Sequence, residues 1–498
     1  MLEVLAAAVA LTGESPPVPK VSAPLPVSAM SHPFSAASHQ KQPLDLAAHG
    51  YVEREFLISG TARVLDWPDA HGLRVLGQGP YVTRILVRRP TDARRFNGTV
   101  IVEPLNPSED VDLPIMWAES YRQLIRDGYA WVGVTIKPNT IKSLNRFDPE
   151  RYAGVSMANP RGGQACAASG INAWSQPTTP ADETGLAWDM LSQIGALLKS
   201  RSAADPMPWP VRRLYMTGQS QTAGYARTYA SVFGGREKAA GGGPLYDGYL
   251  YSGSPPWQVP LNQCRKDLEP GDSRRITAAA GVPVIEIFTQ GDMATNVETR
   301  RPDADGPADR FRRYEVAGAP HVDPWEGLSF ASDADMARAG ERDNSAVERA
   351  CQPSGAPPSD FPNRYVFDAA WRSLDRWVRD GVPAPRAARL VLKAEVQPFS
   401  PEGSFETDAD GNAKGGVRTP TVDVPTARWI GSKTGPFVCL FQGYKHPLGR
   451  ERLTALYPTH AAYVANVRAS TARLVAQRWL TPEDAAEIMQ EAEEHRTP

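Results

Sequence analysis

The fold is decided by one stretch of sequence, Arg213-Leu214-Tyr215-Met216-Thr217-Gly218-Gln219-Ser220-Gln221-Thr222-Ala223-Gly224-Tyr225. A short apolar run leads into Gly-x-Ser, small residues follow, and the pattern from Tyr225 to Phe233 predicts a helix. This order is typical of a strand–turn–helix unit in which a serine sits on a turn so tight that its neighbours must be small. The stretch therefore predicts Ser220 as a nucleophile, which requires a base and an acid elsewhere in the chain.

Short apolar runs and amphipathic segments alternate along the rest of the chain. The apolar runs predict strands at 52–65, 81–89, 99–103, 129–135, 213–219, 249–252, 282–289 and 311–316. Helical periodicity predicts helices at 116–126, 186–198, 225–233 and 365–378. The first two strands fit an antiparallel start to the sheet. The later alternation predicts a mainly parallel sheet with helices on both faces.

The chain divides into three parts by composition. Residues 1–42 are rich in Pro, Ser and Ala and are interpreted as a leader or linker. Residues 43–386 are predicted to form the α/β core, interrupted by long insertions at 137–183 and 255–281 that show little periodicity. Both insertions follow predicted strands, where ligands bind in open α/β sheets, so we expect them to wall the site. Residues 387–498 are expected to form a C-terminal extension packed on the core.

Composition excludes several classes of function. A net charge of -2 over 498 residues gives no electrostatic reason to expect nucleic acid as a partner. The sequence has no P-loop, no HExxH and no dinucleotide glycine pattern, so we expect neither a cofactor nor a metal. The four cysteines are too far apart for a CxxC motif, and the sequence leaves open whether they form disulfides or stay free. They are Cys166, Cys264, Cys351 and Cys439.

The apolar run from Val4 to Leu11 is too short to span a bilayer and resembles the central region of a signal peptide. Glu3 stands where such a peptide carries basic residues. On balance the run slightly favours a periplasmic or secreted protein over a cytoplasmic one. No other stretch approaches about 18 consecutive apolar residues, so we expect no membrane span.

An acid and a histidine follow Ser220 in the required order. Asp292 comes at the end of the predicted strand 282–289, and His321 comes after the predicted strand 311–316. A serine hydroxyl needs a base to take its proton and an acid to orient that base. The chain order Ser, then Asp or Glu, then His is that of an α/β-hydrolase. We therefore predict an α/β-hydrolase fold with Ser220, Asp292 and His321 as the catalytic triad.

Other residues could in principle fill these roles. His460 falls in a predicted helix and His495 in a charged tail, whereas His446 lies in a loop flanked by Gly and Pro and stays open as an alternative base. Among the acids, Glu286 lies in the middle of a strand. Asp323 is only two residues from His321, too close to reach its ring from a separate loop. Asp292 is therefore the preferred acid.

The oxyanion of an acyl-transfer intermediate needs two N–H donors. One is expected from the backbone of Gln221, the residue after the nucleophile. The other is expected from the loop after the predicted strand 99–103, in which Pro107 has no N–H. Leu105 and Asn106 are the remaining candidates in that loop.

Several stretches resemble a family of large bacterial serine hydrolases with an α/β-hydrolase domain, grouped as esterases. The resemblance rests on 43–51, 96–100, 368–378, 457–460, Gly218-Gln219-Ser220-Gln221-Thr222-Ala223, Ala317-Gly318-Ala319-Pro320-His321 and Gly415-Gly416-Val417-Arg418-Thr419-Pro420. It implies the α/β-hydrolase fold and a serine hydrolase acting on esters, and it supports Ser220 and His321. Gln290-Gly291-Asp292 departs from the more acidic family pattern, and Thr222 stands where the second glycine of Gly-x-Ser-x-Gly belongs.

We therefore expect a serine esterase that cleaves a small-molecule ester through an acyl-enzyme. An acyltransferase or a lactonase would use the same triad, and a catalytically silent member would keep the fold for binding. The turn at 408–412 lacks the ligand spacing of a calcium loop. Arg418 could either clamp an acidic substrate or form a structural ion pair. Four tryptophans are expected in or near the walls of the site, namely Trp131, Trp174, Trp188 and Trp257.

Overall fold

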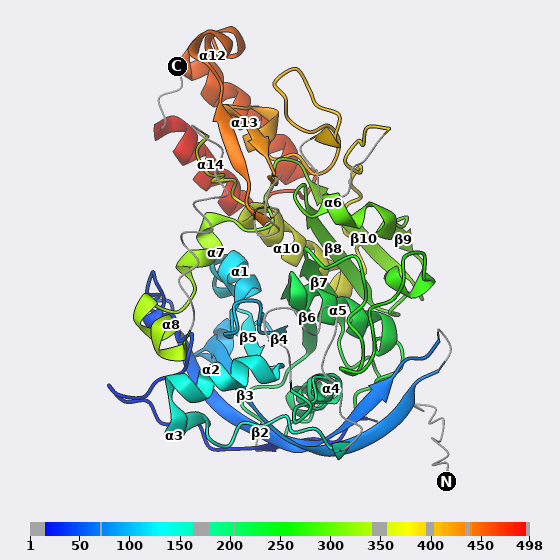
Figure 1. Cartoon of the computed structure of the whole chain (residues 1–498). Coiled ribbons are helices and arrows are strands. Elements are labelled where there is room, and N and C mark those ends of the chain that lie inside the picture. The colour runs from blue at the N-terminus through cyan, green and yellow to red at the C-terminus, as the bar shows by residue number, and fades with distance from the viewer. Residues whose placement is uncertain are drawn as a thin grey trace.

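A ten-stranded sheet runs through the computed structural model of the chain (Figure 1). The structure describes residues 15–69, 72–162, 179–202, 205–340, 356–394, 403–433, 439 and 441–494. The strands of this sheet are β1 (Lys20–Val21), β2 (Tyr51–Asp66), β3 (Arg74–Pro90), β4 (Thr99–Pro104), β5 (Ala130–Val134), β6 (Arg213–Gln219), β7 (Gly248–Ser252), β8 (Pro283–Thr289), β9 (Ala304–Asp305) and β10 (Arg310–Val316). Each strand predicted from the sequence in the core is present.

The strand order is β1-β2-β3-β5-β4-β6-β7-β8-β10-β9. Strands β5, β4, β6, β7, β8 and β10 run parallel to one another, whereas β2 and β3 form a long antiparallel hairpin at one side. The central parallel strands are buried on both faces, which is why they read as continuous apolar runs. The chain crosses from β4 to β5 on one side and then to β6 on the other, so loops after β4 and β6 meet at a topological switch point.

Two sets of helices cover the two faces of this sheet. Helices α4 (Leu186–Lys199) and α5 (Gln221–Val232) pack on one face, and α1 (Ile115–Arg126) and α10 (Arg364–Asp380) pack on the other. The apolar side chains of each pair fall into separate core clusters, one on each side of the sheet. The observed architecture is the predicted three-layer α/β-hydrolase fold.

Shorter helices connect the main elements. They are α2 (Pro138–Phe147), α3 (Pro149–Tyr152), α6 (Met293–Asn296), α7 (Pro324–Leu328) and α8 (Asp333–Ala339). The presence of α2 and α3 shows that the prediction of an irregular insertion at 137–183 was wrong for its first part. Proline begins both helices at a position where its missing N–H costs nothing. The second insertion, 255–281, contains a single 3₁₀ turn, η5 (Ser273–Arg275), and is otherwise loop.

The N-terminal segment is part of the core, contrary to its interpretation as a leader or linker through residue 42. Phe34 is buried, and its backbone oxygen accepts a hydrogen bond from Arg84 Nη1 at 3.0 Å. Arg88 Nη2 donates likewise to the oxygen of Ser35 at 2.7 Å. Two buried guanidinium groups of β3 therefore need this segment as their partner, a role that composition does not reveal. The signal-like run at 4–11 lies outside the described residues.

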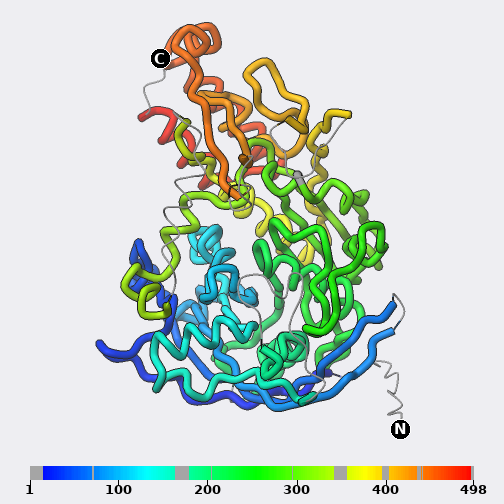
Figure 2. The backbone as a smooth tube through the Cα atoms, viewed as in Figure 1, coloured from blue at the N-terminus to red at the C-terminus, as the bar shows by residue number. Residues whose placement is uncertain are grey.

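The C-terminal extension packs on the core at the end opposite the β2–β3 hairpin (Figure 2). It contains α11 (Pro420–Asp423), β11 (Ala427–Ile430), β12 (Tyr444–Pro447), α12 (Arg450–Leu456), α13 (His460–Ala476) and α14 (Pro482–Glu494). Val417 N–H donates to Glu315 O at 2.7 Å, and Ala317 N–H donates to Val417 O at 3.0 Å. The Gly-Gly-Val-Arg-Thr-Pro stretch therefore runs beside the end of β10, just before the predicted catalytic histidine.

Cys264 and Cys439 each take part in a disulfide bond. Cys166 and Cys351 lie outside the described residues. Among the residues that the structure describes, no helix has the length and apolar character needed to cross a membrane.

Candidate active site

Ser220 stands between the end of β6 and the first residue of α5. Its backbone adopts φ 56° and ψ −122°, a region that non-glycine residues rarely occupy. A side chain at Gly218 would place its Cβ 2.4 Å from the backbone oxygen of Thr222. Only glycine at 218 therefore lets the helix turn back so close to the strand, as the sequence pattern predicted.

Thr222 occupies the place of the usual second glycine and closes the same turn. Its hydroxyl donates to the backbone oxygen of Gln219 at 3.0 Å and lies 3.3 Å from the backbone nitrogen of Gln219. A threonine is therefore accommodated here because its side chain satisfies backbone groups of the turn. Tyr225, which follows on α5, lies in the core and stacks on Trp188 with ring centroids 4.9 Å apart.

The predicted acid and base meet directly. Asp292 follows β8 and His321 follows β10, and these two strands are adjacent and parallel. His321 Nδ1 lies 2.5 Å from Asp292 Oδ1, and both side chains are buried. A carboxylate at Nδ1 holds that nitrogen as the N–H donor and leaves Nε2 as the proton acceptor.

Asp292 is itself fixed in orientation by Thr289. Its Oδ2 accepts hydrogen bonds from the backbone N–H of Thr289 at 2.7 Å and from the Thr289 hydroxyl at 2.8 Å. The carboxylate therefore presents Oδ1 to the imidazole in a single orientation. Burial strengthens the interaction of this carboxylate with a protonated imidazole, because the local dielectric is low.

The imidazole lies beside the serine turn. The Gln219 side-chain nitrogen is 3.3 Å from His321 Nε2 and 3.2 Å from the backbone oxygen of His321. The Ser220 N–H donates to Ser252 O at 2.9 Å, which sets the turn against the end of β7. The Ser220 hydroxyl makes no hydrogen bond to any described residue. Hydrogen bonds of this kind often tighten only when substrate binds.

Gly253 packs directly against the imidazole of His321. Its φ is +63°, and a Cβ there would lie 2.9 Å from His321 Nδ1 and 3.2 Å from Asp292 Oδ1. We expect Gly253→Ala to push the imidazole off Asp292. If the chain has the esterase activity expected from its sequence, kcat for a nitrophenyl ester should fall about a hundredfold, since a shift of 1 Å in a reacting group has that effect. Steady-state kinetics on the purified variant measures it.

The control for this prediction is Gly281→Ala. Gly281 has φ +70°, and no atom lies within 4 Å of the place that a Cβ would take there, so the variant carries the same backbone strain without touching the site. Gly281→Ala should lose some thermal stability because of its positive φ, but it should keep wild-type kcat. Equal kcat values for the two variants would contradict the placement of His321 over Gly253.

The predicted second oxyanion donor is not available in the loop after β4. The Leu105 N–H donates to Val134 O and the Asn106 N–H donates to Leu113 O, both at 2.9 Å. Neither N–H can also point at a substrate, so the prediction of Leu105 or Asn106 was wrong for the backbone donor. The sequence could not show this, because Val134 belongs to β5 and the pairing of Asn106 with Leu113 depends on how the loop folds back on itself. The Asn106 side chain instead donates to Gln219 O at 2.9 Å and braces the serine turn. Gln221 begins α5, where backbone N–H groups point out of the helix end.

The alternative base and acids lie elsewhere. His446 is exposed on β12 opposite Arg428. Glu286 accepts hydrogen bonds from Thr277 and Tyr251 within the core. Asp323 caps α7 by accepting from the backbone N–H groups of Trp325 and Glu326, and it also accepts from that of Asn363. Burial raises the pKa of Asp323 to about 6.

The C-terminal extension contributes a residue that sequence reasoning missed. The Phe441 ring lies 4.8 Å from that of His321 between centroids, and the Val322 N–H donates to Phe441 O at 3.0 Å. The extension therefore covers the imidazole. No local signal marks Phe441, because its role arises from packing between segments far apart in the chain.

Two of the tryptophans expected in the walls are core residues instead. Trp131 is buried and donates to Glu103 Oε2 at 2.7 Å, and Trp188 is buried against Tyr225. Trp257 packs against the core while partly exposed. Trp174 lies outside the described residues. A large aromatic side chain fits the periodicity of a strand or helix whether it packs in the core or lines a site, so the sequence alone could not distinguish these two roles.

Arg418 forms a structural ion pair. Its Nη2 and Nε lie 2.7 Å from Asp408 Oδ2 and from Asp423 Oδ1 respectively. The turn at 408–412 is held by Asp408 Oδ1, which accepts from two backbone N–H groups of that turn. Within the described residues, no group of three or more His, Cys, Asp or Glu side chains is arranged to hold a metal ion.

Solved structures similar to this chain are hydrolases of low sequence identity. A glucuronoyl esterase from Teredinibacter turnerae is 12% identical, with 67% of this chain and 80% of that chain covered and a TM-score of 0.28. An α/β serine hydrolase homologue from Coxiella burnetii is 12% identical, with 49% and 85% covered and a TM-score of 0.26. Likeness at this level carries no information on substrate. No curated protein matches the chain in sequence.

The sequence pattern of one family covers most of the chain. The family described as "Alpha/beta hydrolase domain" matches residues 21–490, which include the core, Ser220, Asp292, His321 and most of the C-terminal extension. The match agrees with the sheet order and with the position of the serine turn between β6 and α5. The chain belongs to this α/β-hydrolase family.

Proposed function

We propose that this protein is a serine hydrolase that cleaves carboxylic esters through an acyl-enzyme. The observation that supports it most strongly is the contact of 2.5 Å between His321 Nδ1 and Asp292 Oδ1, beside a serine held at φ 56°. A buried acid–imidazole pair next to a strained serine is the arrangement that activates a hydroxyl at neutral pH.

In the proposed mechanism Ser220 Oγ attacks the ester carbonyl while His321 Nε2 takes its proton. The tetrahedral intermediate collapses when His321 returns that proton to the leaving alcohol, and the acyl group stays on Ser220. A water molecule then gives its proton to His321 and attacks the acyl carbon. The second collapse releases the carboxylic acid and restores the serine.

Asp292 and the serine turn have separate roles in these steps. Asp292 keeps the proton on Nδ1 and stabilises the imidazolium that forms when Nε2 is protonated. The Gln221 N–H, at the start of α5, is proposed to donate to the oxyanion, aided by the partial positive charge of the helix N-terminus. Gln219 must release His321 Nε2 when the Ser220 hydroxyl approaches it, because both would donate to the same lone pair.

Pre-steady-state kinetics with p-nitrophenyl acetate tests the proposal. An acyl-enzyme that forms faster than it hydrolyses gives a burst of nitrophenol equal in amount to the enzyme, followed by slower turnover. Turnover of the ester without any serine-dependent acyl intermediate, or no turnover of short and medium acyl esters at all, would refute it.

A further inference from the structure

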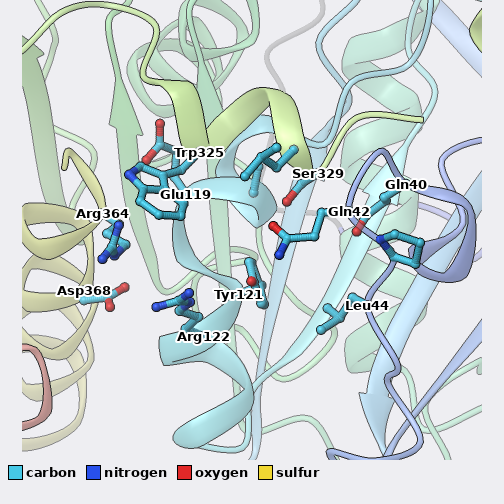
Figure 3. A pocket seen from close by; sticks show the side chains of 13 residues that line it. Gln40, Gln42, Leu44, Glu119, Tyr121, Arg122, Trp325, Ser329, Arg364 and Asp368 are labelled. Carbon is cyan, nitrogen blue, oxygen red and sulfur yellow. The ribbon is translucent and has the colours of Figure 1, made fainter. Parts of the chain in front are cut away.

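A cavity of about 130 Å³ lies between α1, α7, α10 and the segment around residue 42. Figure 3 shows the charged side chains of Arg364, Asp368 and Arg122 on one side of it and the amides of Gln40 and Gln42 on the other. None of its lining residues belongs to the proposed triad. At about 30 Å³ per water molecule, the cavity has room for about four waters or one short organic molecule.

Glu119 of α1 contributes a buried carboxyl oxygen, Oε2, without a hydrogen-bond partner. The side chain is 3% exposed, and no described residue donates a hydrogen bond to it. Burial, together with nearby Asp323 and Glu326, raises the pKa of Glu119 well above its ordinary value. A buried carboxyl group without a donor is costly, and a cationic group in the cavity would remove that cost.

Two residues of α10 present unpartnered polar atoms at the same place. Asp368 Oδ1 accepts no hydrogen bond, and Arg364 leaves Nε and Nη1 without acceptors while its Nη2 donates to Glu487 at 3.0 Å. Both side chains are more than nine-tenths buried. Leu44 and Asp368 come from two of the stretches that carry the family resemblance, and these stretches meet at the cavity.

The opposite wall adds a donor. Gln40 is buried, and its side-chain nitrogen is without an acceptor among the described residues. The cavity therefore presents two carboxyl groups with oxygens that lack donors, beside a guanidinium and an amide with nitrogens that lack acceptors. Water could fill the hydrogen bonds but would supply no charge to Glu119. The rim includes exposed Gln42 and partly exposed Trp325, so a ligand can enter from solvent.

We propose that this cavity binds a small zwitterion of the α-amino acid class. Its ammonium group pairs with Glu119 and Asp368, and its carboxylate accepts from Arg364. The remainder of the molecule points toward Leu44 and Gln40. One such ligand satisfies donors and acceptors of both kinds at once, whereas a simple cation or a simple anion leaves one kind unpaired.

Calorimetric titration of the purified full chain tests the proposal with matched probes. Glycine, L-alanine and L-serine are the zwitterions; ethylamine is L-alanine without its carboxylate, and propionate is L-alanine without its ammonium group. We expect saturable binding of at least one zwitterion below about 10 mM, and binding of ethylamine and propionate at least about tenfold weaker than that of L-alanine. The same zwitterion should raise the melting temperature by mass action.

Glu119→Gln is the decisive variant. The amide has the shape of the protonated carboxyl group, so the variant is expected to fold with a melting temperature no lower than that of the wild type. Its affinity for the zwitterion should fall about tenfold or more, because an amide cannot release a proton to become the counter-charge of the bound ammonium group. Glu406→Gln removes the same charge at an exposed position and should leave the affinity unchanged. The affinity of Arg364→Lys for the same zwitterion tests the proposed contact between Arg364 and the ligand's carboxylate.

Three outcomes would overturn the proposal. They are no saturable binding of any zwitterion, equal binding of ethylamine or propionate, and unchanged affinity in Glu119→Gln. The first would leave a cavity that holds water alone. None of these binding measurements depends on ester hydrolysis, so their outcome is independent of the proposed activity at Ser220.

Discussion

Replacing Ser220 with alanine is expected to lower kcat for p-nitrophenyl acetate by about ten-thousand-fold or more, because the nucleophile of a triad carries the covalent step. The variant should fold normally. Ser220 uses its backbone N–H and oxygen in the turn, and its hydroxyl bonds to no described residue. Alanine keeps both backbone contacts. Steady-state rates and a thermal melt on the same preparation measure the two effects.

Ser38→Ala is a suitable control because Ser38 is exposed and lies in the N-terminal segment. It should retain wild-type kcat. If Ser220→Ala kept more than a few per cent of wild-type turnover after contaminating esterases had been removed, the ester chemistry would have to reside at another group. The proposed function would then fail.

Asp292→Asn is expected to lower kcat by about a thousandfold to ten-thousandfold. The Thr289 N–H can only donate, so it holds the amide oxygen of the new side chain in the place of Oδ2. The amide nitrogen must then face His321 Nδ1. His321 Nδ1 then accepts a hydrogen bond from the amide, and the ring proton moves to Nε2. Nε2 therefore has no lone pair left to take the Ser220 proton.

The predicted loss lies in kcat rather than in KM, because the imidazole acts in the chemical step. Asp333→Asn, an exposed substitution of the same kind, should leave both parameters unchanged. A wild-type kcat in Asp292→Asn would show that the His321–Asp292 contact has no part in the reaction.

The sequence predicted those features that depend on local order. Apolar runs located every central strand, and Gly218, two residues before Ser220, predicted a turn that the backbone of Ser220 confirms at φ 56°. The sequence also placed Asp292 and His321 after two predicted strands, 282–289 and 311–316, without showing that these strands are neighbours. The structure brings the two residues together because β8 and β10 are parallel neighbours.

The remaining features depend on contacts between distant segments. Leu105 reads as open loop, yet its N–H group pairs with Val134 of β5. The packing of Phe34 under β3 and of Phe441 over His321 follows from burial that no local periodicity encodes. The composition of residues 1–42, rich in Pro and Ser, suggested a linker. In the structure, the backbone of this segment accepts hydrogen bonds from the buried Arg84 and Arg88 of β3.

Labelling with a fluorophosphonate tests the central claim most directly, because the reagent reacts only with an activated serine. Peptide mass spectrometry of the labelled, folded protein is expected to find the phosphonyl group on Ser220, with labelling lost in Ser220→Ala and strongly reduced in Asp292→Asn. Labelling at a different serine, or none in folded protein that hydrolyses esters, would contradict Ser220 as the nucleophile.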